Sequence, residues 1–191
     1  MIKLQVILGS TKPNRAGAAV AQWVTATAAR EAGLEVELID IVDYNLPLFD
    51  EPQSPMMNQY TKDHTKQWSA KIAEADAYLW VTAEYNHSVP GALKNAIDFL
   101  RYEWAHKSVG FVSYGVNGGS RAVEHLRGIA GELSLADVRE QLLLYLDRDF
   151  EAYHDFQPTA AHAAQLSKVV GEVATWAEAM QTVRHQQTAN V

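Results

Sequence analysis

IKLQVILGSTKPNRAGAAVAQWV, residues 2–24, sets the architecture expected of this chain. Residues 2–8 are rich in aliphatic side chains, which is typical of a buried strand. Residues 9–15 are polar and basic, and from Ala16 onward apolar residues recur at helical spacing. A strand, a short loop and a helix in this order predict the first βα unit of a parallel sheet.

The loop of this unit is suited to bind an anion. Free backbone N–H groups and the positive end of the helix dipole are expected at the carboxyl edge of the sheet, a common phosphate site. Ser10 adds a hydroxyl, Lys12 and Arg15 add positive charge, and Gly17 permits close approach of a ligand. Neither a Walker Gly-Lys-Ser/Thr nor a GxGxxG pattern follows the strand, which argues against an ATPase and a Rossmann dehydrogenase. An ordinary connection without a ligand is the alternative.

The remaining sequence repeats the alternation of apolar and amphipathic segments. Further strands are predicted at residues 34–40, 76–83, 108–115 and within 137–145. Helices are predicted over about residues 16–32, 60–75, 92–104, 120–133 and 159–184. Gly33 is expected to end the first helix, and Trp176 is expected on the inward face of the last. Residues 147–158 are expected to form a solvated acidic loop, and residues 186–191 a frayed end.

Residues 41–58 are predicted to form a long loop, because they hold three prolines and little periodicity. The loop also carries Leu46, Leu48, Phe49, Met56 and Met57, which are too apolar for a freely solvated segment. Two explanations are open: the loop folds back onto its own domain, or it packs against another subunit.

Five alternations of strand and helix predict an α/β fold with a parallel sheet and helices on both faces. The expected strand order is 2-1-3-4-5, the flavodoxin-like order. Ligands of such sheets bind beyond the carboxyl ends of the strands, where strands one and three are neighbours. Residues 9–17, 84–90 and 115–119 are expected to meet there. The length of 191 residues suits a single domain, residues 1–191.

Composition excludes several classes of function. The net charge of −7 disfavours nucleic acid as a partner, and the lack of cysteine excludes disulfides, thiolate chemistry and iron–sulfur clusters. The histidines form no HExxH pattern and no serine lies in GxSxG, so neither a metal site nor an α/β-hydrolase is expected. A strand directly after Met1 leaves no room for a targeting peptide, and no apolar run could span a bilayer. A soluble, cytoplasmic protein is expected.

The three loops together suit a ligand that is planar at one end and phosphorylated at the other. FMN fits this description, as do other mononucleotides, and the strand order favours the flavin. Structural explanations compete for single residues: Glu84 as a cap of a turn, Tyr85 as a packing residue, and His87 as a solvated side chain.

Three motifs, LGSTKPNR, AEYNHSVPGALKNAIDFL and SYGVNGGSRAVEHLR, resemble the NADPH-dependent FMN reductase family, which includes azoreductases and quinone or chromate reductases. The resemblance covers residues 2 to about 135 and implies FMN and NADPH as cofactors. It assigns the FMN phosphate to Ser10, Lys12, Arg15, Gly17 and Ala18, the ribityl chain and ring to Glu84, Tyr85, Asn86 and His87, and the pyrimidine end of the ring to Tyr114 and Gly115. It also implies a homodimer or tetramer with the flavin near the subunit interface. Two positions depart from the family pattern, Lys12 in place of arginine and Ala83 in place of proline.

The expected function is therefore an NAD(P)H-dependent flavin oxidoreductase with a ping-pong mechanism. Hydride passes from NAD(P)H through FMN to a small-molecule acceptor such as a quinone, an azo compound, a metal oxyanion or free flavin. No side chain is expected to act as a dedicated catalytic acid or base. A flavodoxin-type electron carrier, reduced by a partner protein, is the main alternative. A mononucleotide-binding interaction domain without a redox role is the third.

Overall fold

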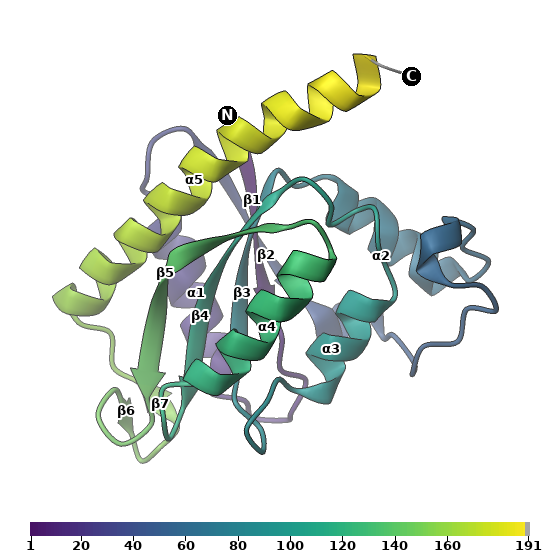
Figure 1. The fold of residues 1–191 in the computed structure, drawn as a ribbon. Coiled ribbons are helices and arrows are strands. Elements are labelled where there is room, and N and C mark those ends of the chain that lie inside the picture. The colour runs from purple at the N-terminus through teal and green to yellow at the C-terminus, as the bar shows by residue number, and fades with distance from the viewer. Residues whose placement is uncertain (190–191) are drawn as a thin grey trace.

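The computed structural model, which describes the backbone of residues 1–189, contains a five-stranded parallel sheet between two layers of helices (Figure 1). The strands run in the order β2-β1-β3-β4-β5 and all neighbouring pairs are parallel. Their bounds are β1 (Ile2–Leu8), β2 (Leu34–Asp40), β3 (Ala77–Ala83), β4 (Ser108–Gly115) and β5 (Ala136–Tyr145). The predicted fold class and strand order are confirmed.

Five helices cover the sheet, two on one face and three on the other (Figure 1). Helices α1 (Gly17–Ala28) and α5 (Ala160–Ala189) share one hydrophobic cluster. Helices α2 (Asp63–Ala73), α3 (Gly91–Asp98) and α4 (Ser120–Glu132) share the other. Side chains of β1 alternate between these faces: Leu4 and Val6 join the first cluster, and Ile7 joins the second.

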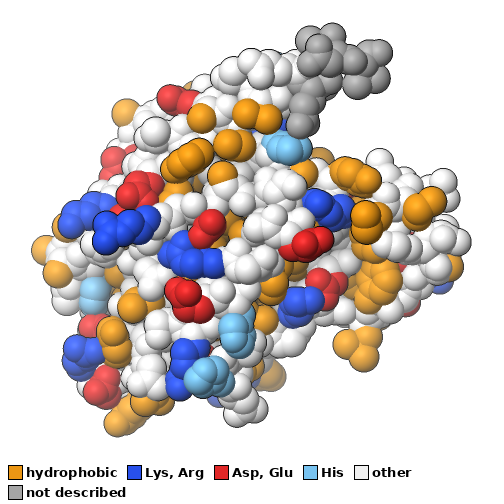
Figure 2. All heavy atoms as spheres, in the orientation of Figure 1, with side chains coloured by type: hydrophobic (Ala, Val, Ile, Leu, Met, Phe, Trp, Pro, Cys, Tyr) orange, Lys and Arg blue, Asp and Glu red, His pale blue; other side chains and the backbone are white. Residues whose placement is uncertain are grey.

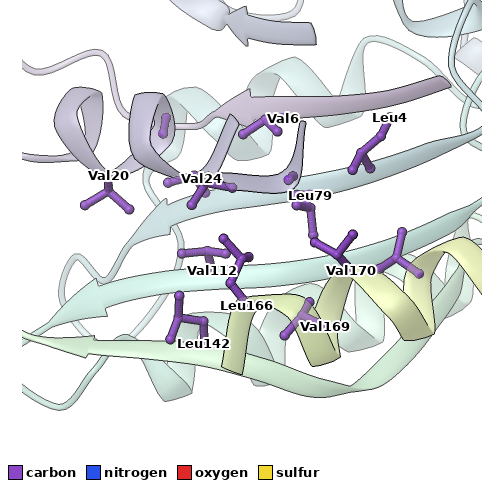
Figure 3. Packing of buried hydrophobic residues seen from close by; sticks show 14 of the residues in the cluster. Leu4, Val6, Val20, Val24, Leu79, Val112, Leu142, Leu166, Val169 and Val170 are labelled. Atoms are coloured by element: carbon purple, nitrogen blue, oxygen red, sulfur yellow. The ribbon is translucent and has the colours of Figure 1, made fainter. Parts of the chain in front are cut away.

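The first cluster packs α5 tightly across the centre of the sheet (Figure 3). Val169 and Val170 of α5 lie close to Leu79 and Val112 of the two central strands. A Cβ at Gly110 would lie only 2.7 Å from Val173 Cγ2, so a side chain there would push α5 away from β4.

The second cluster contains a group of aromatic rings packed edge to face. The ring of Trp104 lies 5.0 Å from Tyr78, 5.7 Å from Trp80 and 6.2 Å from Trp68. This packing explains why α3 ends at Asp98, although a helix over residues 92–104 was predicted. The chain unwinds after α3 and turns Trp104 inward, where its indole N–H donates to the carbonyl of Ile97 at 3.2 Å.

Two other helices are shorter than predicted. Helix α1 ends at Ala28, and Gly33 is not its cap; with φ +84° Gly33 forms the turn into β2, where its carbonyl accepts the N–H of Ile2. Helix α2 begins at Asp63 rather than near residue 60, because the Glu51 carboxylate accepts the N–H groups of Thr61 and Lys62.

The C-terminal helix departs from the prediction at two places. Trp176 is 47% exposed, so its expected inward position is wrong; Val173 and Ala177 make the contact with the sheet instead. Residues 186–189 continue α5 rather than fray, and residues 190–191 of the predicted frayed end lie outside the described part. None of the helices within residues 1–189 is long and apolar enough to cross a membrane.

Both long loops contain short elements. Residues 147–158 include a two-stranded hairpin, β6 (Phe150–Glu151) and β7 (Asp155–Phe156), where only a solvated loop was predicted. Residues 41–58 include two 3₁₀ turns, η1 (Ile41–Tyr44) and η2 (Pro55–Met57).

The first explanation for residues 41–58, packing onto their own domain, holds for part of that loop, and packing against another subunit stays a prediction. Leu46 packs against the second cluster of its own domain, whereas Leu48, Met56 and Met57 are exposed. Figure 2 shows hydrophobic side chains at the right of this view, where Figure 1 places the segment between β2 and α2.

Candidate functional site

The loops that follow β1, β3 and β4 meet at the carboxyl edge of the sheet, as predicted, and surround one pocket. Its lining consists of Lys12, Asn14, Arg15, Ala16, Ala83, Glu84, Tyr85, Tyr114, Gly115, Leu146, Tyr153 and His154. The pocket therefore brings together six of the predicted site residues: Lys12, Arg15, Glu84, Tyr85, Tyr114 and Gly115.

The side of the pocket formed by the loop after β1 is electropositive. Within the described residues, no side chain caps the N-terminus of α1 and its first turn holds no acidic residue. Arg15 pairs with Asp40 at the end of β2, and its Nε is buried without a hydrogen-bond partner among residues 1–189. Gly17 and Ala18 supply the first helical turn. An uncapped helix terminus beside an unsatisfied guanidinium nitrogen fits a bound phosphate.

The hydroxyl groups of Ser10, Tyr85 and Tyr114 lie next to this loop, and those of Ser10 and Tyr114 belong to buried side chains. Ser10 is fully buried, and its Oγ lies 3.1 Å from the hydroxyl oxygen of Tyr85. The Tyr114 ring reaches beneath α1, where a Cβ at Gly17 would overlap its hydroxyl and lie 2.9 Å from its Cζ. Burial raises the pKa of Tyr114 to about 12, so its hydroxyl stays protonated near neutral pH. Ser10 is therefore buried beside the loop and is not part of the pocket lining, and its assignment to the FMN phosphate stays a prediction.

Glu84 joins the second loop to the third. Its side chain is 6% exposed and forms an ion pair with the guanidinium of Arg121. The carboxylate also accepts the backbone N–H of Arg121, in the first turn of α4, at 3.2 Å. This double contact holds Glu84, which lines the pocket, against the start of α4.

Asn86 and His87 lie at the exposed tip of the second loop and do not line the pocket. Both have positive φ, 48° and 74°, in a tight turn closed by reciprocal backbone hydrogen bonds between Tyr85 and Ser88. The imidazole of His87 lies 6.4 Å from that of His125 in α4. His125 Nδ1 and Ser88 Oγ are joined by a hydrogen bond of 2.7 Å. Their assignment to the flavin stays a prediction.

Sequence reasoning missed the wall supplied by the β6–β7 hairpin. Tyr153 and His154 at its tip line the pocket, and His154 Nε2 lies 2.8 Å from the carbonyl oxygen of Asn14. The available signal was the recurrence of aromatic residues in FEAYHDF, residues 150–156. Glycine and asparagine, which usually mark a tight hairpin, are absent from that segment.

Among the residues that the structure describes, no group of three acidic or histidine side chains is placed to hold a metal ion. The donor set of the pocket instead suits an organic phosphate: two cationic side chains and a helix N-terminus at one side, tyrosines and backbone at the other.

Comparison with known proteins agrees with this geometry. A family model described as NADPH-dependent FMN reductase matches residues 2–148. An NAD(P)H-dependent FMN reductase of Schizosaccharomyces pombe is 37% identical over 175 residues, covering 89% of this chain and 88% of the relative. A quinone reductase of Escherichia coli (strain K12) is 36% identical over 135 residues, covering 66% of this chain and 69% of the relative. The fold is also similar to that of FerB, a flavoenzyme NAD(P)H:(acceptor) oxidoreductase from Paracoccus denitrificans. The two structures align with a TM-score of 0.67 at 21% identity, covering 95% of this chain and 98% of FerB.

The fold defines a flavodoxin-like protein, and the three-loop pocket lies at the switch point of its sheet, where ligands of such folds bind. Within that class, the chain belongs to the NADPH-dependent FMN reductase family. It is a flavin oxidoreductase whose cofactors are FMN and NADPH.

Proposed function

We propose that this chain works by a ping-pong mechanism and passes electrons from NAD(P)H to a quinone-type small molecule. FMN, when bound, supplies the two-electron chemistry by accepting hydride from NAD(P)H and delivering it to the second substrate. Support for a quinone comes from relatives such as the Escherichia coli quinone reductase and a 2-hydroxy-1,4-benzoquinone reductase of Burkholderia sp., which is 29% identical over 156 residues.

In this proposal the loop after β1 holds the FMN phosphate. Lys12 and Arg15 supply charge, and the backbone of Gly17 and Ala18 presents the start of α1 to the phosphate, with the Ala18 N–H donating to the Arg15 carbonyl at 3.3 Å in this structure. Ser10 keeps the loop in place from behind. The observation that carries the assignment is the buried, unpartnered Nε of Arg15 beside the uncapped α1 terminus. A phosphate there would satisfy both.

The other two loops would hold the ribityl chain and the ring. Tyr85 offers a partly exposed ring to the pocket, and Glu84 fixes its loop against α4. We assign Asn86 and His87 to the ring side, and Tyr114 and the backbone of Gly115 to the pyrimidine end. No side chain is assigned as a catalytic acid or base, since the cofactor carries the redox step.

We further propose that the protein is a cytoplasmic, single-domain homodimer or tetramer, with neither nucleic acid nor membrane as a partner. The exposed apolar side chains of Leu48, Met56 and Met57 support an interface formed by residues 41–58. Sedimentation of the wild type against Leu48→Asp and Met57→Asp variants tests this. A wild type that sediments as a monomer would contradict it.

A visible spectrum before and after anaerobic NADPH tests the redox function. We expect the purified protein, or the protein after FMN is added, to show flavin absorption that NADPH bleaches. Initial rates at varied NADPH and quinone should then give parallel double-reciprocal lines, whereas intersecting lines would rule out the ping-pong mechanism. Flavin that NADPH leaves oxidised would favour the electron carrier, and failure to bind FMN would favour the non-redox domain.

A further inference from the structure

The tip of the β6–β7 hairpin is held in a backbone conformation that its sequence disfavours. The turn is closed by the N–H of His154, which donates to the carbonyl of Glu151 at 3.0 Å. The two residues inside the turn, Ala152 and Tyr153, have φ of 49° and 60°. Asparagine and glycine normally fill such positions, because a Cβ makes positive φ costly. A strained turn of this kind persists where contacts outside it hold it in place.

The strands of the hairpin are anchored by Phe150 and Phe156 in the first hydrophobic cluster, and His154 ties its tip to the loop after β1. Its Nε2 lies 2.8 Å from the backbone oxygen of Asn14, in the loop after β1, and its Nδ1 lies 2.7 Å from the carboxylate of Asp155. Both partners accept hydrogen bonds from the ring, the backbone carbonyl of Asn14 and the exposed carboxylate of Asp155. Each ring nitrogen must therefore donate, and only the doubly protonated imidazolium can do so.

The charges around His154 show what this cation faces. Asp155 belongs to its own hairpin and balances it directly. Across the contact, Lys12 and Arg15 from the loop after β1 and Glu84 from the loop after β3 share the pocket. Arg15 and Glu84 are already paired, with Asp40 and Arg121. Within the described part of the chain, Lys12 and His154 are the cations of this lining that form no ion pair with another element, and both border the proposed phosphate site.

We propose that the β6–β7 hairpin is a protonation-dependent latch on the cofactor's phosphate loop, in which cationic His154 fastens Asn14 and adds positive charge to the site. The proposal rests on FMN binding in this pocket, as proposed above. Hydrogen bonds from His154 to Asp155 and Asn14 raise the pKa of its imidazole above the ordinary value, and the nearby Lys12 opposes this. As pH rises through that pKa, one of the two donors and the charge are lost together.

The latch predicts a pH dependence that only phosphorylated flavin shows. Affinity for FMN should fall as pH is raised from about 6.5 to 9, a range in which the flavin phosphate itself stays mostly dianionic because its second pKa is about 6. Riboflavin has the same ring and no phosphate, so its affinity should not follow the same curve.

Isothermal titration calorimetry of the apo-protein with FMN and with riboflavin tests this. His154→Gln keeps an amide donor and removes the charge, and should weaken FMN binding near pH 6.5 by about three- to fivefold, the scale of one exposed charge contact. The variant should bind riboflavin like the wild type and should show a flatter pH profile for FMN. Asp155→Asn, which keeps His154, should move the wild-type profile to lower pH.

A matched control removes one positive charge elsewhere. Lys168 lies on α5, beside Asp137 and Arg139 of β5 rather than at the carboxyl edge of the sheet. Lys168→Gln should therefore leave the affinities for FMN and riboflavin unchanged. Equal loss of FMN and riboflavin affinity in His154→Gln, or no loss of either, would overturn the latch. A wild type that binds neither flavin would instead overturn the proposed function.

Discussion

Replacing Gly17 by alanine tests whether Tyr114 sets the height of α1 above the sheet. The added Cβ would overlap the Tyr114 hydroxyl and lie 2.9 Å from Cζ and 3.1 Å from Leu8 Cδ1. Ordinary contact begins near 3.4 Å, so the ring must retreat by at least 0.5 Å. Tyr114 is 6% exposed and packs 6.1 Å from the ring of Phe150, which leaves it little room to move.

The expected cost is that of overpacking a buried site, about 1–3 kcal/mol of unfolding free energy. For a chain of this length this corresponds to a fall in melting temperature of about 2–4 °C per kcal/mol. FMN affinity should fall as well, because the displaced α1 terminus carries the proposed phosphate donors. Adding Tyr114→Phe removes the overlapping hydroxyl and should restore part of the stability.

Urea unfolding and calorimetric titration with FMN measure both effects. Gly171→Ala is the matched control, because it adds the same methyl group to a helix at a position with open space, and should be neutral or stabilise by up to about 1 kcal/mol. A Gly17→Ala protein that unfolds and binds FMN like the wild type would refute the packing argument. So would a double variant no more stable than the single one.

Three further outcomes are expected. Arg15→Ala should lower FMN retention after gel filtration by about tenfold, as expected for a lost charge-assisted contact, and full flavin occupancy in this variant would refute the phosphate assignment. His87→Ala should leave the rate of flavin reduction by NADPH within about tenfold in stopped-flow absorbance, and a loss of about 10²–10⁴ would instead mark it as an acid or base. Burial lowers the pKa of Lys107, which donates to the carbonyls of Ile72 and Ala73, to about 7. Between about pH 7 and 10 the unfolded chain therefore binds a proton at Lys107 that the folded chain lacks. The free energy of unfolding, measured by urea titration, should rise with pH over this range. A Lys107→Met variant that keeps the same rise would contradict this.

The sheet was predictable because its signals are local. Residues 108–115 were predicted as a strand and form β4 with those bounds, since a continuous apolar run between turn residues has one good interpretation. The strand order followed from the number of alternations and the handedness of the crossovers. The meeting of the three loops then followed from the order of the strands, without any knowledge of side-chain contacts.

Helix ends and the hairpin were not predictable in the same way, because distant contacts decide them. The end of α3 depends on Trp104 finding space among Tyr78 and Trp80, and the start of α2 depends on Glu51. The contact of His154 with Asn14 joins positions 140 residues apart in the chain, in a turn without the usual turn residues. Local propensity carries no information about the helix ends or about the hairpin.

The aromatic group beneath α2 and α3 gives the protein an intrinsic optical probe. Trp68, Trp80 and Trp104 are fully buried within one cluster, and Trp80 lies on β3, the strand whose loop borders the flavin pocket. Tryptophan emission overlaps the near-ultraviolet absorption of oxidised flavin, so energy passes from the indoles to a bound isoalloxazine. Quenching of this emission would report the filling of the pocket, without a label and in the same cuvette in which NADPH is added.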